Sequence, residues 1–400
     1  MKLGDVIKIN QRAIKKNYPH KNILYADIGS VGEGLVDDLE EIILADAPSR
    51  AKRIVFKNDT ILSTVRPRNR SFYYFKEAQD NLIASTGFAV LTPIKEYINE
   101  RFLYYLISNR SFTSYLGNHE KGAAYPAITT DVIENYELEL PILEIQKRIA
   151  DILSAYDDLI ENNLKRIKLL EQAAQNIYKE WFVNLRFPGH ENTPINEETG
   201  LPEGWEYGVV SDLCEVKSGY AFKSKQWKKE GNPVIKIKNI NNNTVSLNDS
   251  GFVDDEVADV AKKYELFTGD VVIAMTGATV GKVGLIPKID KRIYLNQRVG
   301  LFRPLSEEND NIALVFSFFL TDDSQQQVLN FAQGAAQPNI SGSEIGNIKL
   351  NIADSKVLSE FNKLTKPSID LIQTLYGQNH KLKAARDILL PRLMNRTIEV

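Results

Sequence analysis

A repeating pattern of apolar residues between Ile149 and Trp181 constrains the fold of this chain more than any other feature. Apolar side chains recur at alternating intervals of four and three residues for more than four heptads, and Asn163 is the one polar residue in the series. This spacing is typical of a long helix whose narrow apolar stripe pairs with a second helix, whereas a core helix of a bundle usually has a wider apolar face. The helix would be roughly 50 Å long at 1.5 Å per residue.

A weaker copy of the stripe follows 212 residues later, over residues 361–393. Thr365, Ser368 and Arg386 replace apolar residues in it. Pro367 should lie in a first helical turn or cause a kink, because proline lacks the N–H group of an interior hydrogen bond. The two stripes together predict two long helices that pair with each other.

The polar position of each stripe indicates how the helices run. In an antiparallel pair Asn163 lies opposite Asn379, whereas a parallel pair that matches the repeats sets Asn163 against Leu375 and leaves its buried amide without a partner. We therefore predict an antiparallel coiled coil. The residues expected to form it are Ile149, Leu153, Ile160, Asn163, Ile167, Leu170 and Trp181 in the first helix, and Ile372, Leu375, Asn379, Leu382, Leu389 and Leu393 in the second.

The segments outside the helices are also duplicated. "GDVVIAMTG" (269–277) matches "NDTILSTVR" (58–66) at an offset of 211, and "GAAQPNIS" (334–341) matches "GAAYPAIT" (122–129) at 212. Both copies combine short β-rich runs, turns and a helical segment, which predicts an α+β chain with two mixed α/β domains and an internal pseudo-twofold repeat.

The expected boundaries follow from these landmarks and from a proline- and glycine-rich linker that precedes Trp205. They are a first domain at 1–142, a central spacer helix at 143–187, the linker and second domain at 188–350, and a C-terminal spacer helix at 351–400. Within the domains we expect one helix over residues 98–116, a strand over 134–141 and a buried helix over 312–320.

Composition limits the class of protein. The chain has 400 residues, 43% of them hydrophobic and 25% charged, which is ordinary for a soluble protein of two or three domains. The longest apolar run, 312–320, is too short to span a bilayer, and the single Cys214 fits a reducing cytoplasm without disulfides. Four scattered histidines suggest no metal site. A net charge of −3 argues against nucleic-acid coating by charge alone but allows a local basic patch.

Catalytic motifs are not evident. "TGATVGKVG" (276–284) lacks the spacing of a phosphate-binding loop, and neither an N-P-P-Y type tetrapeptide nor an E-x-K nuclease strand occurs. We therefore expect no cofactor, no metal and no catalytic residue in this chain.

Basic, aromatic and amide side chains on expected turns are the remaining functional candidates. Three arginines alternate in "VRPRNRSFYYF", which suits a hairpin that faces DNA, or equally a charged edge strand. In the second half, lysines alternate with aromatic residues in "SGYAFKSKQWKK". We expect the lysines to contact phosphates, and we expect Arg298 and the amide side chains beside it to read bases. The candidates are Arg66, Arg68, Arg70, Lys121, Tyr125, Lys223, Lys225, Lys282, Asn296, Gln297, Arg298, Gln337 and Asn339.

The order of several motifs carries a family resemblance. "SGYAFKSKQW", "PVIKIKNI", "GDVVIAMTGATVGKVG", "GAAQPNIS", "PILEIQKRIADIL" and "LLPRLMNR" together resemble the specificity subunit of Type I restriction-modification systems over nearly the whole chain. The first copy departs from the second, because it has "VRPRNR" where the second has "TGATVGK".

The resemblance implies two target recognition domains, each reading one half of a bipartite, asymmetric target in double-stranded DNA, with the helices setting the gap. It implies two methyltransferase subunits as partners, and restriction subunits in the full complex. Adenine methylation and ATP-driven cleavage would then belong to those partners, and the chain itself would be a cytoplasmic protein without catalytic activity.

Two alternatives come from other classes of protein. One is a coiled-coil scaffold that does not bind DNA, and the other is an enzyme with an unrecognised active site. Binding of S-adenosylmethionine by the chain alone would indicate the enzyme, and gel shifts with methyltransferase partners would separate the scaffold from the specificity subunit.

Overall fold

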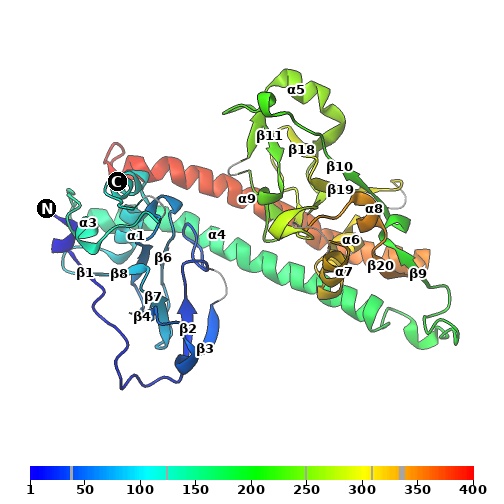
Figure 1. Cartoon of the computed structure of the whole chain (residues 1–400), viewed down its shortest axis with the longest axis horizontal. Coiled ribbons are helices and arrows are strands. Elements are labelled where there is room, and N and C mark those ends of the chain that lie inside the picture. The colour runs from blue at the N-terminus through cyan, green and yellow to red at the C-terminus, as the bar shows by residue number, and fades with distance from the viewer. Residues whose placement is uncertain (37–38, 123–124, 248–249, 308–309, 333–337) are drawn as a thin grey trace. The chain divides into compact units, whose positions relative to one another are not determined.

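Two long helices, α4 (Leu143–Tyr178) and α9 (Ser355–Met394), form where the sequence predicts them (Figure 1). Helix α4 continues into a π-helical turn, Lys179–Val183. Pro367 lies inside α9 rather than in its first turn, which leaves the kink as the remaining one of the two expected outcomes. Its ring is exposed, and so is Lys363, whose carbonyl loses its helical partner and can bind water instead.

The computed structural model describes residues 1–36, 39–122, 125–247, 250–307, 310–332 and 338–400. They form two units. Unit 1 comprises Met1–Leu159 and Leu382–Val400, and unit 2 comprises Ile160–Lys381. The division falls within both long helices, so each helix contributes residues to both units.

Unit 1 contains two four-stranded sheets among its described residues. The strand order of the first is β1-β8-β5-β6 and that of the second is β3-β2-β7-β4, in which only β2 and β7 are parallel. The bounds are β1 (Ile7–Ile9), β2 (Asn22–Ala26), β3 (Glu40–Ile43), β4 (Ala51–Ile54), β5 (Thr60–Ser63), β6 (Phe72–Tyr74), β7 (Leu82–Ser85), β8 (Phe88–Pro93), α1 (Glu100–Ser108), α2 (Arg110–Asn118) and α3 (Thr130–Glu134).

Unit 2 repeats this topology in its described residues. Sheet order β10-β19-β16-β17 matches the first sheet of unit 1 and is extended by β13 and β12, and β14-β11-β18-β15 matches the second, again with one parallel pair, β11 and β18. The bounds are β9 (Glu206–Val209), β10 (Cys214–Ser218), β11 (Asn232–Ile235), β12 (Ile240–Asn241), β13 (Thr244–Val245), β14 (Gly251–Val253), β15 (Glu265–Leu266), β16 (Val271–Ala274), β17 (Val283–Leu285), β18 (Ile293–Leu295), β19 (Val299–Pro304), β20 (Lys349–Ile352), α5 (Asp255–Val260), α6 (Ile312–Phe319), α7 (Asp322–Ala332) and α8 (Gly342–Gly346). The predicted tandem repeat and the buried helix near 312–320 are confirmed.

The helices pair in antiparallel fashion within each unit. In unit 2 the rings of Trp181 and Phe361 lie 5.6 Å apart, and Asn163 bonds to Asn379. Buried stripe residues in unit 1 are Ile149, Leu153 and Leu393, with Leu382 and Leu389 partly buried. Those in unit 2 are Ile160, Asn163, Ile167, Trp181, Ile372, Leu375 and Asn379, with Leu170 packed against the core.

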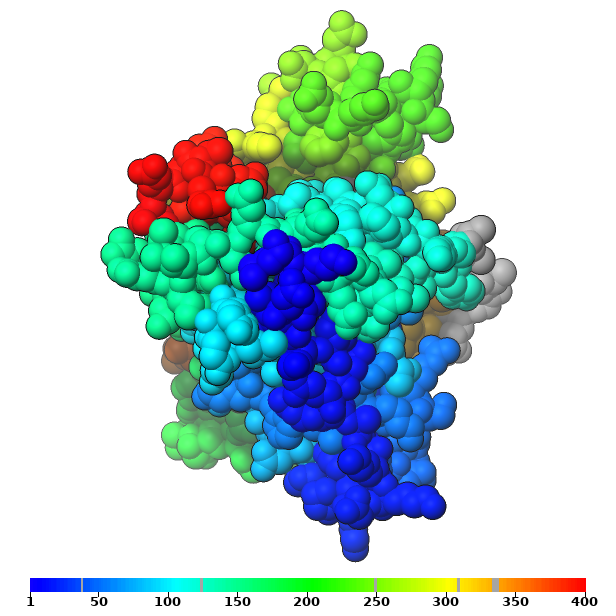
Figure 2. Space-filling model, turned by 90° about the vertical axis from the view of Figure 1, so that its left-hand side faces the viewer, coloured from blue at the N-terminus to red at the C-terminus, as the bar shows by residue number. Residues whose placement is uncertain are grey.

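Two local expectations in unit 1 are wrong. The helix over 98–116 is broken at Asn109, whose extended backbone ends α1 and whose side chain accepts a hydrogen bond from Ser111 N to start α2. The segment 134–141 is not a strand, because Glu137 forms a single bridge, with Lys2. Its alternating apolar residues, Tyr136, Leu138 and Leu140, instead pack on the domain core. Part of the N-terminal segment, dark blue in Figure 2, lies on the surface of this unit. Leu3 of this segment is buried in the domain core, and its N donates to Tyr136 O.

Candidate nucleic-acid interface

In unit 1 three segments meet at the end of β5. Thr64 N donates to Gly87 O at 2.8 Å, Arg66 N donates to Pro126 O at 2.7 Å, and Ile128 N donates to Thr64 O at 2.9 Å. These bonds hold the β5–β6 hairpin, the β7–β8 turn and the segment around 126 against one another. We call this arrangement the loop junction.

Unit 2 has the same loop junction, bond for bond. Met275 N donates to Arg298 O at 3.0 Å, Gly277 N to Pro338 O at 2.9 Å, and Ile340 N to Met275 O at 2.9 Å. The duplicated landmarks of the sequence therefore mark a duplicated backbone structure, although the side chains differ between the copies.

Side chains from all three segments of the unit 2 junction line a pocket of about 280 Å³. Gln297, Arg298 and Asn339 are exposed there, and they were singled out from the sequence. The remaining lining residues are Met275, Thr276 and Pro338. The buried hydroxyl of Thr276 has no hydrogen-bond partner among the described residues.

Asn296 has a different position from the neighbouring candidates. Its Oδ1 accepts from Arg298 N at 3.3 Å and its backbone oxygen accepts from Val299 N at 2.9 Å, so its side chain shapes the β18–β19 turn. Gln337 lies outside the described residues.

The three arginines of the unit 1 hairpin are not equivalent. Arg68 donates to Glu120 Oε1 at 2.8 Å and to a backbone oxygen of α2. Arg70 is largely buried and donates to Glu33 at 2.7 Å as well as to α2 and the end of α1. Both therefore hold the hairpin in place, which the alternation in the sequence could not distinguish from DNA contact.

Arg66 is exposed, and its head group lies over an aromatic ring. Its Cζ is 5.1 Å from the centroid of Tyr125, which is itself 72% exposed. The backbone of Lys121 pairs with Ala127 through two hydrogen bonds, and its side chain is exposed. The structure thus brings Arg66, Lys121 and Tyr125 to one junction.

The lysine candidates of unit 2 flank its junction. Lys223 and Lys225 are exposed on a turn that follows Tyr220, whose backbone oxygen accepts from Gln297 N at 3.0 Å. Lys282 is also exposed, and its backbone oxygen accepts from Ala274 N at 2.9 Å.

The sequence did not single out Lys236, which packs on the ring of Trp227. Lys236 Nζ lies 3.6 Å from the centroid of the Trp227 ring, and burial, with the nearby charge of Lys238, lowers the pKa of Lys236. The adjacent Ile237 lies 3.5 Å from the position that a Cβ on Gly277 would take, so this turn borders the junction. The alternating lysines of "IKIKNI" were the available signal.

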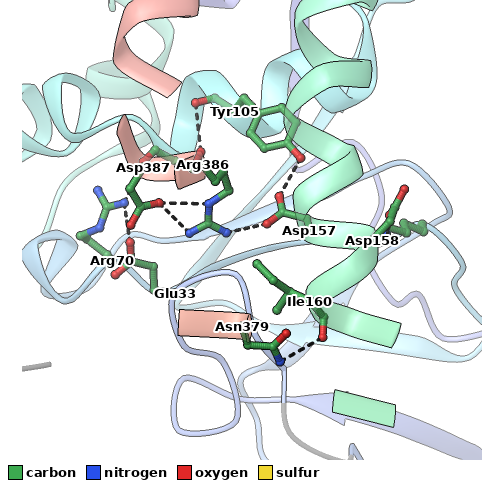
Figure 3. Close-up of polar contacts among 11 residues, drawn as sticks. Glu33, Arg70, Tyr105, Asp157, Asp158, Ile160, Asn379, Arg386 and Asp387 are labelled. Atoms are coloured by element: carbon green, nitrogen blue, oxygen red, sulfur yellow. Dashed lines mark hydrogen bonds and ion pairs between the residues drawn. The ribbon is translucent and has the colours of Figure 1, made fainter. Parts of the chain in front are cut away.

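A partly buried ionic cluster fixes the helices to the domain within unit 1. Asp157 of α4 lies between Tyr105 of α1, whose hydroxyl donates at 2.6 Å, and Arg386 of α9, whose Nη1 donates at 2.5 Å (Figure 3). Burial alone would lower the pKa of Arg386, but Asp157 and Asp387 raise it above its usual value. Burial and Asp157 also raise the pKa of Tyr105, so the cluster holds a charged pair and a neutral phenol.

The duplicated junctions, the repeated sheet topology and the helix pair define a class of proteins with two similar α/β domains and two long paired helices. Residues 1–172 and 202–375 match the family model described as the Type I restriction modification DNA specificity domain, and the chain belongs to this family. In the described residues, no helix combines the length and apolar character needed to cross a membrane.

Individual relatives are similar over most of their length. The specificity subunit of the Type I restriction enzyme MjaIX from Methanocaldococcus jannaschii is 26% identical over 85% of this chain and 78% of that protein. The HindI specificity subunit from Haemophilus influenzae is 24% identical over 99% of this chain and 98% of that protein. The crystal structure of the S subunit of a Type I restriction-modification system from M. genitalium is 15% identical, covers 98% of this chain and 95% of that chain, and has a TM-score of 0.56, which shows the shared fold.

Proposed function

We propose that this chain is the DNA-specificity subunit of a Type I restriction-modification complex. Each recognition domain reads one half of a bipartite, asymmetric target, and the helix pair sets the unread gap. The observation that carries this proposal is the loop junction, which has the same backbone hydrogen bonds in both units but different side chains. Two copies of one reading scaffold on a single chain suit two short DNA words, just as half-site spacing reflects protein geometry in dimeric repressors.

The division of labour among side chains follows their chemistry. Exposed Arg66, Lys121 and Tyr125 are the DNA contacts of unit 1. In unit 2, Lys223, Lys225 and Lys282 contact phosphates. Pocket residues of unit 2 face the bases, because only base edges carry sequence information.

Catalysis belongs to partner subunits in this proposal. Two methyltransferase subunits modify the target that the chain selects, and restriction subunits join them in the full complex. The chain alone contributes recognition and assembly, in the cytoplasm.

An exchange of recognition domains tests the proposal. Residues 1–142 are replaced by the equivalent domain of a relative, the complex is assembled with its methyltransferase subunits, and methylated sites are sequenced. The donor domain must keep a tyrosine at the position of Tyr105, because its hydroxyl bonds to Asp157 of the retained helix. It must also keep an arginine at the position of Arg101, because Arg101 Nη1 donates to Ser154 Oγ of the same helix at 2.7 Å. The buried Gln146 side chain needs no such match, because its partners among the residues that the structure describes are backbone groups, of Tyr97, Asn99 and Pro141.

One half of the methylated word should change and the other should stay. The reciprocal exchange of the second domain is the control and should change the other half. A complex that assembles but shows no sequence preference in gel shifts would instead support the scaffold, and changes in both halves from either exchange would contradict modular reading.

A further inference from the structure

The two loop junctions carry opposite side-chain chemistry on the same backbone. Isolated bridges join Val65 to Ala127 in unit 1 and Thr276 to Asn339 in unit 2. The bond from Thr64 N to Gly87 O likewise corresponds to the bond from Met275 N to Arg298 O. Four hydrogen-bonding residues of unit 2, Thr276, Gln297, Arg298 and Asn339, therefore stand where unit 1 has Val65, Thr86, Gly87 and Ala127.

Substitution of this kind changes what each junction can recognise. Three of the four positions in unit 1 carry an aliphatic side chain or none. At the corresponding positions unit 2 carries a hydroxyl, a guanidinium and an amide, and Gln297 adds a second amide. Unit 2 thus offers directional hydrogen bonds where unit 1 offers shape and apolar contact.

The donors and acceptors in the unit 2 pocket match one class of ligand. A glutamine or asparagine amide can form a bidentate contact with N6 and N7 of adenine, and an arginine can form one with O6 and N7 of guanine. Carboxylates, which accept from the amino group of cytosine, are absent from the described residues that line the pocket. This set of side chains favours the major-groove edge of a purine.

Phosphate is the competing ligand for any site that contains arginine. Two of the three exposed polar side chains in this pocket are neutral amides, which carry no positive charge to attract a phosphate but can discriminate between bases. The lining also contains the apolar side chains of Met275 and Pro338, which suit the edge of a base rather than a charged oxygen. Lysines on the neighbouring turns, Lys223, Lys225 and Lys236, are better placed for the backbone.

We propose that the pocket formed by Thr276, Gln297, Arg298 and Asn339 reads a purine in the half of the target recognised by unit 2. This inference rests on the proposed function and adds the chemical class that the site recognises. In unit 1 Val65, Gly87 and Ala127 cannot make these contacts, so its base-reading groups are the other exposed side chains of the junction, Arg66 and Tyr125. The two half-words are therefore read with different chemistry as well as different sequence.

The test uses the complete complex with its methyltransferase subunits. The wild-type word is first determined by sequencing methylated sites. Gln297→Ala, Arg298→Ala and Asn339→Ala are then compared on duplexes that carry each single base-pair change. We expect each variant to lose about 5- to 150-fold of the discrimination at a purine position in the unit 2 half-word, and to leave the unit 1 half-word unchanged.

Matched threonines provide a control for side-chain loss. The hydroxyls of Thr276 and Thr279 are both buried without a hydrogen-bond partner among the described residues, but only Thr276 lines the pocket. Thr276→Val should weaken discrimination severalfold, whereas Thr279→Val should not. All five variants should keep the wild-type melting temperature, which separates reading from folding.

The possible failures are distinguishable. Equal weakening on every duplex, with a shallower dependence on salt, would assign the pocket to a phosphate and overturn the inference. Unchanged discrimination in all three alanine variants would also overturn it. A wild-type complex without any preferred word would instead overturn the proposed function itself.

Discussion

Asn163 and Asn379 face each other across the helix pair of unit 2. Asn163 Nδ2 donates to Asn379 Oδ1 at 2.9 Å. Asn379 Nδ2 in turn donates to the backbone oxygen of Ile160 at 3.4 Å (Figure 3). Both side chains are almost fully buried among apolar residues. A buried amide pair of this kind fixes helix register, because any slip places each amide against an apolar side chain.

The amide pair should be more costly to break than to remove. Asn163→Leu leaves Asn379 with an unsatisfied buried group and should destabilise the chain by about 1 to 3 kcal/mol. The double variant Asn163→Leu and Asn379→Leu should recover most of this loss, because replacing both partners by apolar groups of similar shape is nearly neutral. Urea unfolding of the three proteins measures the difference. A double variant less stable than the single one would contradict the argument.

The ionic cluster of unit 1 gives a second prediction for stability. Arg386 and Asp157 have side chains only 18% and 20% exposed. Arg386→Ala leaves the Asp157 carboxylate uncompensated, and we expect a loss of about 2 to 4 kcal/mol, somewhat less than for a fully buried pair. Lys57→Ala is the matched control, because its partner Glu77 and Lys57 itself are mostly exposed, and it should cost about 0.5 kcal/mol or less. Equal losses in the two variants would show that burial does not determine the effect.

Glu171 should make the stability of unit 2 depend on pH. Burial raises its pKa to about 6, and hydrogen bonds from Asn243 and Tyr376 lower it in part. Because the folded pKa is the higher one, the folded chain binds the proton more tightly. The stabilisation from protonation is therefore complete below the unfolded pKa and is lost as the pH rises through about 6.

Acidification from pH 7.5 to 5 should thus stabilise the wild type by about 1 kcal/mol relative to Glu171→Gln, which keeps the side-chain shape but cannot titrate. Chemical denaturation at both pH values gives the comparison. Glu161→Gln is the control. Glu161 lies on the same helix, its side chain is 42% exposed and it pairs with Lys165, so this variant should keep the pH dependence of the wild type. A Glu171→Gln variant with the same pH dependence as the wild type would exclude this residue as the source.

Periodicity carried most of what could be predicted about the fold. The long helices, their antiparallel pairing and the repeat follow from regular spacing along the chain, of apolar residues every three or four positions and of landmarks that recur after 211 or 212 residues. The break at Asn109 and the irregular segment 134–141 were missed. In the first, a side chain bonds to the local backbone, and in the second, alternation serves packing on a core rather than a sheet.

The residue types of the candidate site could be predicted from the sequence, but their arrangement in space could not. Gln297, Arg298 and Asn339 line one pocket. The sequence could indicate that their loops belong together, because both loops recur in the two copies. Arg66 and Arg70 look alike in sequence, yet Arg70 is bound by Glu33, a residue of a loop far away along the chain. Asp157 and Arg386 form a pair because α4 and α9 are antiparallel, whereas in the sequence Arg386 is visible only as a polar residue that interrupts the apolar stripe.

The helix pair should act as a ruler, and the division of the chain shows where to lengthen it. The two units divide between Leu159 and Ile160 in α4 and between Lys381 and Leu382 in α9. One heptad inserted at both places keeps the apolar stripes in phase and adds no residue inside either unit. Seven residues at 1.5 Å each add up to roughly 10 Å of helix.

Duplex DNA rises about 3.4 Å per base pair, so the unread gap should grow by about one to three base pairs while both words stay unchanged. The lower figure allows for bending of the helices or the DNA. Sequencing of sites methylated by the reassembled complex measures the gap directly. Insertion of two residues at each place is the control, and it should destabilise the chain because it turns each apolar stripe away from its partner. Heptad variants that alter the words and leave the gap unchanged would show that the helices do not set the spacing.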